Sequence, residues 1–527
     1  MSRYNQKATP KVTTVTNAQG GTGFKYDPKT ELVAILATGI ENKFYEKTGE
    51  REKRLADVIT EVSKKDKTFV AKALVYARSV MGQRTVTHFG AVELAKILAG
   101  DPLGSRFFSK RDRKANRGGI VFRLDDMLEI AACYQARNPG KHFSNAIKKG
   151  FKAALEAADE YELAKYQAKN RDLSLVDIVN LVRPKPSKEM IPVFAKLMKG
   201  ELKQFNTVED KNTKAGQEVA AKVKAGTITK AEAAKQLAEA KEENYVELIT
   251  TRKIGYLALL RNLRNILKTG SSVELIQGAC ELLTDKALVK KSLVFPHQID
   301  LALEILLLEF GGAATPFLKA LNTAYELSIP NLTELFSHGR TAVVFDTSGS
   351  MHSMSWGNGG VKIDGKNINK APIDKAALIG ATLAKGIGAD LYHFASSCEA
   401  IKFNPLDSVN TIKNTGLKLE GRVGHGTSFE SIFSTLNKSG KYDRIFIISD
   451  MQGGDSIVRG SSYQAYTRTH GQPFIYTIDI QGYGTTMFKQ DSKLIQLFGY
   501  GADIYEYVKK AELDPKALFK AIEAIEI

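Results

Sequence analysis

The sequence has little cysteine and no long hydrophobic run. Three cysteines occur among 527 residues, and their positions, Cys133, Cys280 and Cys398, form no paired spacing. This argues against a disulfide framework or a thiolate metal site and suits a reducing cytoplasm. Apolar stretches such as the one around Ile305–Leu308 stop well short of the roughly 20 residues that span a bilayer. Residues Met1–Lys7 contain no apolar segment of a signal peptide. We therefore expect a soluble cytoplasmic protein without a membrane partner.

Acidic residues are fewer than basic ones, and the difference is unevenly distributed. The chain has 75 Lys and Arg against 58 Asp and Glu, a formal net charge of +17. Residues 341–527 carry about +1 of this charge, which leaves about +16 on residues 1–340. Such asymmetry is typical of a polyanion partner, although a basic surface can also serve solubility alone. We favour RNA or DNA as a partner, and charge alone does not distinguish them.

Strand-like alternation is absent from residues 28 to 338, which are predicted to be almost continuous helix. Apolar residues recur at helical spacing in several segments. These are 30–39, 54–62, 67–81 and 273–283. A chain of this length predicts more than one domain, and many short helices in series predict an α-solenoid over residues 1–339.

One segment of the helical region differs from the rest. Residues 209–243 are rich in Ala, Lys and Glu and have few large apolar residues. Thr229 followed by Glu232 has the spacing of a capping box, which marks the start of a helix. We interpret the segment as a solvated helical hairpin inserted in the array.

After Arg340 the pattern changes to α/β. Short apolar runs typical of buried parallel strands alternate with helical stretches. The predicted strands are 341–345, 391–395, 444–449 and 474–480, and the predicted helices are 371–385, 428–437 and 515–525. This order predicts a doubly wound parallel sheet over residues 340–527. Ligands of such folds bind beyond the carboxyl ends of the strands.

Two of these strands end in an aspartate. Asp346 is followed by Ser348 and Ser350, Asp450 ends a later strand, and Thr427 lies in a Gly-rich loop between them. Carboxylate and hydroxyl oxygens at one sheet edge suit Mg²⁺, which keeps water and leaves a position for an external carboxylate or phosphate. The alternative is that these residues only cap turns and helices. We see no nucleophile–base pair here and predict no enzyme activity.

The basic half contains several candidates for phosphate contacts. Basic residues recur at helical spacing between residues 141 and 152, with apolar residues opposite. The basic members are Lys141, Lys148, Lys149 and Lys152. Further candidates are Arg111, Arg113 and Arg117 in a loop and Arg261 and Arg264 on a later helix. Each could be a solvated amphipathic face, but together with the charge asymmetry they favour nucleic-acid binding.

The Asp-x-Ser-x-Ser, Thr and Asp set resembles the metal-ion-dependent adhesion site of the von Willebrand factor A family. A basic helical array followed by such a domain is similar to the TROVE family, the Ro ribonucleoproteins. The matching segments are Gln19-Gly-Gly21, Gly39–Gly49, Leu259–Ile266 and Phe295-Pro-His297. The resemblance implies HEAT-like helical repeats that close into a ring, with the A domain joining the ends.

The resemblance also implies a function. Members of the family bind Y RNAs outside the ring and single-stranded 3′ ends of misfolded RNAs in its hole, and bacterial members work with exoribonucleases. Lys165, before Tyr166, matches an RNA-contacting lysine of the family. The family's histidine before Leu-Lys-Pro is replaced here by Leu181, so that contact is not carried over. A monomeric protein in the particle is expected.

The alternatives belong to other classes. A metal-dependent protein-interaction module with an incidental basic surface would capture an acidic partner and ignore ribonuclease. A nuclease would need a second carboxylate cluster for two-metal chemistry, and the sequence shows only one such site.

Overall fold

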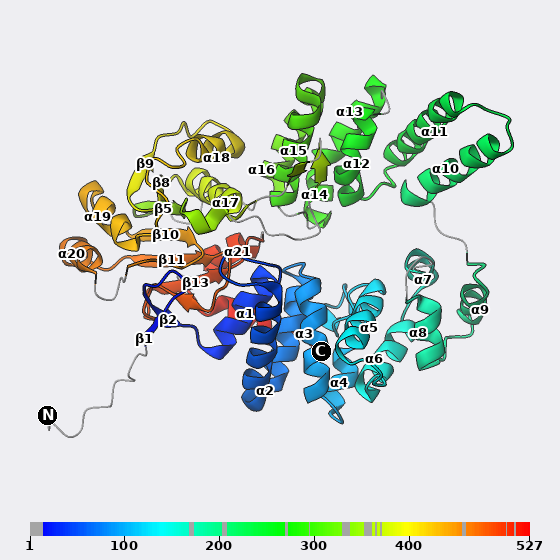
Figure 1. The fold of residues 1–527 in the computed structure, drawn as a ribbon, viewed down its shortest axis with the longest axis horizontal. Helices are drawn as coiled ribbons and strands as arrows, with labels where there is room; N and C mark the ends of the chain where they lie inside the picture. The colour runs from blue at the N-terminus through cyan, green and yellow to red at the C-terminus, as the bar shows by residue number, and fades with distance from the viewer. Residues whose placement is uncertain are drawn as a thin grey trace.

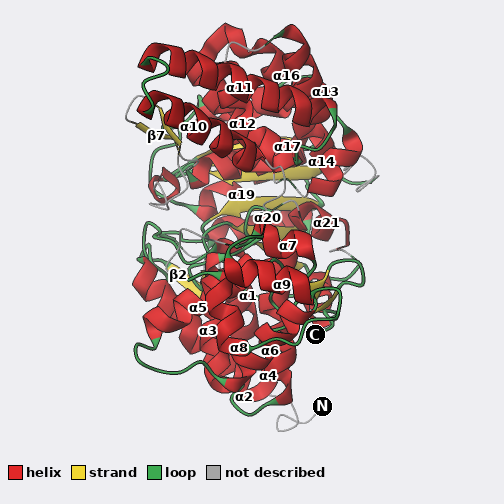
Figure 2. Ribbon diagram, turned by 90° about the vertical axis from the view of Figure 1, so that its right-hand side faces the viewer, coloured by secondary structure: helices red, strands yellow, loops and turns green. Residues whose placement is uncertain are grey.

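In the computed structural model, an α/β domain carries two arms of helices (Figure 1). The described residues are 14–167, 173–202, 208–268, 272–292, 294, 296–328, 338–352, 361–363, 366–368, 371–455, 460–501, 503–510 and 513–527. Phe295, in one of the motifs, lies outside them. Figure 2 shows that the main strands lie between the two groups of helices.

The first arm consists of helices α1 to α9. Their bounds are α1 Pro28–Thr38, α2 Thr48–Ser79, α3 Thr85–Ile97, α4 Pro102–Phe107, α5 Asp125–Arg137, α6 Asn145–Glu156, α7 Glu160–Lys165, α8 Leu175–Val182 and α9 Ile191–Lys199. The segments 54–62 and 67–81, predicted as two helices, are joined in α2 across a kink at Asp66 (φ −153°). The Asp66 carboxylate accepts from the backbone N of Phe69 at 2.9 Å, as an N-cap does, so the second half of α2 has a capped start of its own.

A short hairpin within the first arm was not predicted. Strands β3 (Arg111–Asp112) and β4 (Arg117–Gly118) pair antiparallel. Each has only two residues, too few for an alternating pattern to appear in the sequence.

The second arm consists of helices α10 to α16. Their bounds are α10 Val208–Lys224, α11 Lys230–Thr250, α12 Tyr256–Lys268, α13 Val273–Leu283, α14 Lys286–Ser292, α15 Pro296–Phe310 and α16 Thr315–Ser328. Helices α10 and α11 pack against one another over the segment interpreted as an inserted hairpin (Figure 1). Thr229 and Glu232 form reciprocal capping hydrogen bonds at the start of α11.

One stretch, Pro296–Ser328, is long and apolar enough by composition to cross a membrane. It is interrupted by a 3-10 turn at Gly311–Ala314, and α15 packs against α16. Neither helix, at 15 and 14 residues, reaches the roughly 20 residues that a span requires. Residues of this stretch also contact the α/β domain, so we interpret it as a pair of packed, partly buried helices that leave an apolar edge exposed at Leu307 and Leu308.

The α/β domain contains a six-stranded sheet of order β13-β11-β10-β5-β8-β9. The strands are β5 Thr341–Asp346, β8 Asp390–Phe394, β9 Cys398–Ile401, β10 Arg444–Ser449, β11 Phe474–Asp479 and β13 Leu494–Phe498. The helices are α17 Pro372–Ile387, α18 Val409–Leu417, α19 Phe429–Ser439, α20 Ser461–His470, α21 Asp503–Lys510 and α22 Ala517–Glu523. All pairings are parallel except that of the edge strand β9. A hairpin of β6 (Val361–Ile363) and β7 (Lys366–Ile368) lies outside this sheet.

Both faces of the sheet are covered by helices. Alternate residues of β5 belong to different cores: Val343 and Phe345 pack with α17, and Ala342 and Val344 pack with α19. Burial on both faces explains the continuous apolar run of β5. The predicted combination of a helical array and a doubly wound α/β domain is confirmed.

The first arm is fastened to the α/β domain by its N-terminal residues. Strands β1 (Thr14–Thr16) and β2 (Thr22–Lys25) form a sheet with β12 (Thr485–Thr486), in which β2 pairs antiparallel with β12. The Tyr26 hydroxyl donates to the Asp479 carboxylate at 3.0 Å. Residues near the start of the chain therefore complete a sheet of the C-terminal domain.

The second arm is fastened to the other side of the α/β domain. Lys413 on α18 donates to Asp300 on α15 at 2.5 Å, and both side chains are buried. The hydroxyls of Tyr325 and Thr382 lie 2.7 Å apart. The α/β domain thus joins the two ends of the helical array, as the family resemblance implies.

A buried carboxylate ties three helices of the first arm together. Asp126 on α5 accepts from Arg78 on α2 at 3.0 Å and lies 3.0 Å from the imidazole of His88 on α3. Its other oxygen accepts from the backbone N of Phe122 and of Arg123. Burial alone would raise the pKa of Asp126, but the hydrogen bond with His88 and the charge of Arg78 outweigh burial and hold this pKa at about 2.

Candidate functional site

The predicted metal-binding residues come together at the carboxyl ends of β5 and β10. The two strands are neighbours and parallel, so Asp346 and Asp450, at and just after their last residues, meet at one sheet edge. Both aspartates and Ser348 are 0% exposed, and Ser350 and Thr427 are also buried. The Oγ atoms of Ser348 and Ser350 lie 3.4 Å apart.

The two carboxylates differ in their hydrogen bonds. Asp346 accepts from the backbone N of Ser348 at 2.8 Å and from the Ser449 hydroxyl at 2.6 Å. One oxygen of Asp450 accepts from the backbone N of Gln452 at 3.0 Å. Its other oxygen, Oδ2, is buried without a hydrogen bond of ordinary geometry to the described residues. A buried acceptor left in this state is costly unless another group binds it.

Charge at this edge also favours a cation. Burial raises the pKa of Asp346 to about 6. Burial, with the charge of Asp346 next in importance, raises the pKa of Asp450 well above its ordinary value. A divalent ion would reverse both effects by favouring the ionised carboxylates. Two carboxylates and three hydroxyls are oxygen donors that fit Mg²⁺.

The described residues contain no group of three or more His, Cys, Asp or Glu side chains placed to hold a metal. A site here would therefore depend on the hydroxyls of Ser348, Ser350 and Thr427 as much as on the carboxylates. Hydroxyl and carboxylate oxygens in place of imidazole or thiolate point to a hard cation.

Two residues of this edge were not predicted. Ser449 donates to Asp346, and it directly precedes Asp450, so its proximity could have been read from the sequence. Gln452 donates to the Thr485 hydroxyl at 3.0 Å and accepts from the backbone N of Ala18 at 2.9 Å. The loop after Asp450 is therefore tied to the N-terminal hairpin, which no local pattern indicates.

An aromatic group from the first arm borders the same edge. Tyr45 packs against Phe44 and Tyr483, with ring centroids 4.8 and 5.4 Å apart. Burial raises the pKa of Tyr45 to about 12, the charges of Asp450 and Asp346 add to this increase, and a hydrogen bond with Ser350 opposes it. The Tyr45 hydroxyl thus lies within hydrogen-bonding reach of a predicted metal ligand.

The predicted basic row is carried by α6. Ile147 and Phe151 are fully buried, as the amphipathic pattern predicts. A Cβ on Gly150 would approach Cβ of Phe108 to 2.3 Å, so glycine at this position lets α6 pack closely against the end of α4. Lys141 precedes the helix, because Ser144 caps it, and therefore is not part of the helical face.

Lys148, Lys149 and Lys152 lie on the outer side of α6. Lys149 is exposed and the other two are half-buried. Within the described residues none of the three forms an ion pair. Their charge is available to an external anion.

The three arginines of the upstream loop have different environments. Arg111 is 2% exposed and donates to the backbone oxygens of Gly118 and Asn116, each at 2.8 Å. Its guanidinium is used to hold the β3–β4 hairpin, so it cannot contact RNA as predicted. Arg113 and Arg117 are exposed. The Arg113 guanidinium stacks over Phe122 at 4.2 Å.

Lys165 lies in a cluster of aromatic and basic residues at the end of α7. Its ammonium lies 5.3 Å from the ring of Tyr161 and 5.7 Å from that of Tyr166. The guanidinium of Arg123 lies 5.3 Å from the ring of Tyr166. Tyr161 is 45% exposed. Exposed aromatic rings beside cations are groups on which unstacked bases can stack.

Arg261 and Arg264 lie on α12 of the second arm. Arg264 forms an ion pair with Glu309, which reduces the charge it offers to a ligand. Arg261 is exposed at the edge of a groove of about 430 Å³ between α12 and α15, lined by Leu260 and Ile305. These two arginines belong to a different arm from α6 and α7 (Figure 1).

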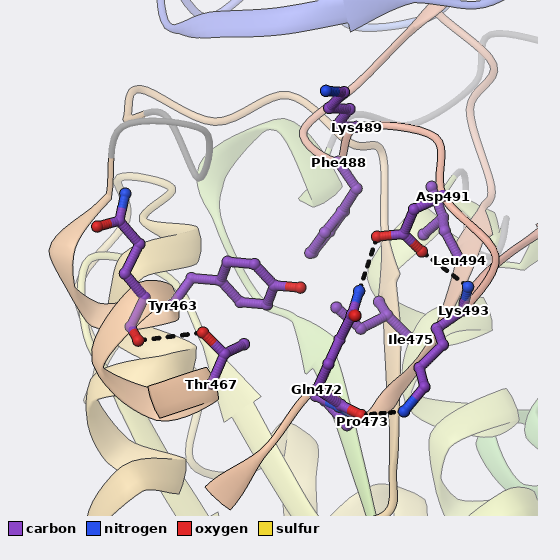
Figure 3. Close-up of a pocket in the computed structure, with 11 residues that line it drawn as sticks. Tyr463, Thr467, Gln472, Pro473, Ile475, Phe488, Lys489, Asp491, Lys493 and Leu494 are labelled. Atoms are coloured by element: carbon purple, nitrogen blue, oxygen red, sulfur yellow. Dashed lines mark hydrogen bonds between the residues drawn. The ribbon is translucent and has the colours of Figure 1, made fainter. Parts of the chain in front are cut away.

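A cavity of about 340 Å³ opens on the α/β domain between α20 and the amino ends of β11 and β13 (Figure 3). Its polar side chains bond one another: Gln472 donates to Asp491 at 2.8 Å, and Lys493 donates to the backbone O of Gln472 at 2.6 Å. It lies at the strand ends opposite to Asp346 and Asp450 and is not part of the candidate metal site.

Comparisons with known proteins agree with this architecture. Residues 231–310 match the TROVE domain family. The fold is similar to the crystal structure of the Ro (RSR) protein of Deinococcus radiodurans, with a TM-score of 0.56 and 17% identity, over 92% of this chain and 100% of that one. No curated protein matches in sequence. The second arm thus contains a match to the TROVE domain family, and nearly the whole chain has a fold similar to that of a Ro protein.

Proposed function

We propose that this protein is the non-catalytic RNA-binding scaffold of a Ro-type ribonucleoprotein. Its ligands would be small structured Y-like RNA and the single-stranded 3′ ends of misfolded RNA, and its role RNA quality control or decay in the cytoplasm. The protein would act as a monomer in the particle, with an exoribonuclease as a further partner. The observation that carries the proposal is the row of Lys148, Lys149 and Lys152 on α6, which form no ion pairs within the described residues.

The neighbouring groups support RNA rather than duplex DNA. The cluster of Lys165, Tyr161 and Tyr166 offers stacking surfaces beside a cation. Such surfaces bind bases that are not paired. Phosphate contacts from α6 would add affinity without reading sequence.

A competition assay tests this function. A hairpin RNA with a free 3′ tail is expected to bind more tightly than the same hairpin with a blunt end or the DNA version of the tailed form. The assay is run at about 0.15 M salt, where non-specific phosphate binding is already weak. Equal, weak binding of all three would reduce the basic half to a generic polyanion surface.

We further propose that Asp346, Ser348, Ser350, Thr427 and Asp450 bind Mg²⁺. The ion would neutralise two buried carboxylates and would accept a further oxygen ligand from outside. The buried Oδ2 of Asp450, which has no hydrogen bond of ordinary geometry to the described residues, is the observation that supports it. An adhesion module that captures an acidic protein partner through this ion is the second candidate function.

Replacing Asp346 with Ala is expected to lower Mg²⁺ affinity by at least about tenfold, since a ligating or hydrogen-bonding carboxylate is lost, and to leave RNA affinity unchanged. Calorimetric titration with Mg²⁺ and the RNA assay measure the two effects. Asp407→Ala, in a turn before α18, is the matched control. RNA binding that depends on Asp346 and on Mg²⁺ would contradict the separation of the two sites.

A further inference from the structure

The cavity between α20 and the amino ends of β11 and β13 has an aromatic wall (Figure 3). The rings of Tyr463 and Phe488 both pack edge-on against Phe433, with centroids 4.8 and 6.3 Å away. Phe488 is 4% exposed, and Tyr463 is half-buried. Ile475 and Leu494 add apolar surface to the lining. With a volume of about 340 Å³ the cavity lies in the size range of small-molecule sites, and its aromatic wall favours a planar ring.

A carboxylate borders this aromatic wall. Asp491 accepts from the Gln472 side-chain amide at 2.8 Å and from the backbone N of Lys493 at 2.7 Å. The Tyr463 hydroxyl hydrogen-bonds Gln472 in turn, so these contacts hold the carboxylate in place (Figure 3). Asp491 is exposed, and each of its oxygens can accept a second hydrogen bond. The cavity therefore offers a fixed pair of acceptor oxygens to a ligand that carries two adjacent N–H donors.

Two lysines beside the carboxylate make the local charge positive. The Lys493 ammonium donates to the backbone O of Gln472 at 2.6 Å, which uses one of its three N–H donors. Lys489 is exposed, and neither lysine forms an ion pair within the part of the chain that the structure describes. Lys493 also lines a second cavity of about 480 Å³, together with Lys441 and Arg444. This charge attracts an anionic group and disfavours a cationic ligand such as an arginine side chain.

We infer that the cavity is a binding site for a guanine mononucleotide. Guanine is planar, and its N1–H and N2–H groups form the paired edge that the Asp491 carboxylate can accept. The phosphate is the anion that Lys489 and Lys493 can bind. Adenine and cytosine carry a single amino group at this edge, and uracil a single N–H, so the carboxylate favours guanine.

The charge of the surrounding domain favours a free nucleotide over a nucleotide within an RNA strand. Residues 341–527 carry a net charge of only about +1, which gives a chain of phosphates little attraction. The cavity is also separate from the candidate metal site, at the opposite strand ends, and from the lysines of α6 in the first arm. The inference therefore depends on neither of the functions proposed above.

The test is calorimetric titration of the full-length protein with GMP, AMP and guanosine. A single-stranded RNA pentamer of uridines with one central guanosine is then titrated as a competitor of GMP. The variants are Asp491→Asn and Lys489→Gln. Asp407→Asn, before α18, and Lys438→Gln, exposed on α19, are the matched controls.

The wild-type protein is expected to bind one GMP per chain, at least about tenfold more tightly than AMP. Asp491→Asn is expected to weaken GMP about tenfold, the effect of one hydrogen bond to a charged group, and to bring GMP and AMP within about threefold of one another. Lys489→Gln is expected to weaken GMP about fivefold and to leave guanosine unchanged, because only the phosphate contact is lost. Both controls should bind GMP within about twofold of wild type.

Three results would overturn the inference. Absence of saturable GMP binding would refute the site, and equal affinities for GMP and AMP in the wild type would refute the recognition of guanine by Asp491. A pentamer that displaces GMP and binds more tightly than GMP would assign the cavity to RNA. Tailed-RNA affinity is measured in the same variants, and a value equal to that of the wild type shows that a loss of GMP binding does not come from unfolding.

Discussion

Replacing Lys148, Lys149 and Lys152 together by Glu is expected to weaken binding of tailed RNA on the order of a hundredfold at about 0.15 M salt. The three lysines form no ion pairs within the described residues, so their whole charge is available to phosphates. Losing three contacts removes the release of about two counterions, and the new carboxylates add repulsion. Fluorescence anisotropy over a range of salt concentrations measures both the RNA affinity and the slope of its logarithm against the logarithm of salt concentration.

The matched control changes the same charge elsewhere. Lys222, Lys224 and Lys230 are exposed on the α10–α11 hairpin, and their replacement by Glu alters net charge equally. If RNA is attracted only by the net positive charge, the two triple variants should lose equal RNA affinity. A specific surface on α6 predicts a large loss for the first variant alone, with its salt slope reduced by about two.

Replacing Asp126 with Asn is expected to destabilise the first arm by about 3–5 kcal/mol. Asp126 is 0% exposed and Arg78 is 5% exposed, so the substitution leaves a buried guanidinium without its counter-charge. Urea unfolding followed by circular dichroism measures the change. Asp57→Asn, exposed on the same helix as Arg78, is expected to change stability by less than about 0.5 kcal/mol.

The same carboxylate predicts the response to acid. The folded pKa of Asp126, about 2, lies below the ordinary value near 3.8, so the ionised form is favoured by folding. Its contribution is complete above about pH 4 and is lost as pH falls through about 2, an effect on the order of 2 kcal/mol. The Asn variant should lack this part of the acid destabilisation. An identical acid profile in the two proteins would contradict the role given to Asp126.

Much of the fold could be predicted because it depends on local patterns. Helix α13 has the predicted bounds, and the strands β5 and β10 have them within a residue. The edge strand β9 and the strand β13 were missed, because strands of four and five residues with a polar member carry weak periodicity. Helix α2 was predicted as two helices. Asp66 caps the second half of α2 at an internal kink, and a cap in the sequence does not show that the two halves are continuous.

The candidate site was predictable where its residues follow strand ends. Asp346 and Asp450 could be placed together because parallel strands align their carboxyl ends. Tyr45 could not, since more than 300 residues separate it from Ser350 and only the docking of the first arm brings them together. Arg111 was predicted to contact RNA because the sequence shows its charge. The sequence does not show that its side chain is buried and bonded within the β3–β4 hairpin.

The pairing of β2 with β12 has a consequence for how the chain folds as it is made. Asn17 donates to the backbone O of Gly453 at 2.8 Å, and Lys72 donates to the backbone O of Glu523. In each pair the residue of the α/β domain is synthesised more than 400 residues after its partner near the start of the chain. At about 5–20 residues per second, the ribosome needs on the order of a minute to supply the second partner. During that time the N-terminal hairpin exposes an unpaired strand edge, a surface prone to association with other chains. Docking of the first arm must therefore wait until the ribosome has made the partners at Gly453 and Glu523.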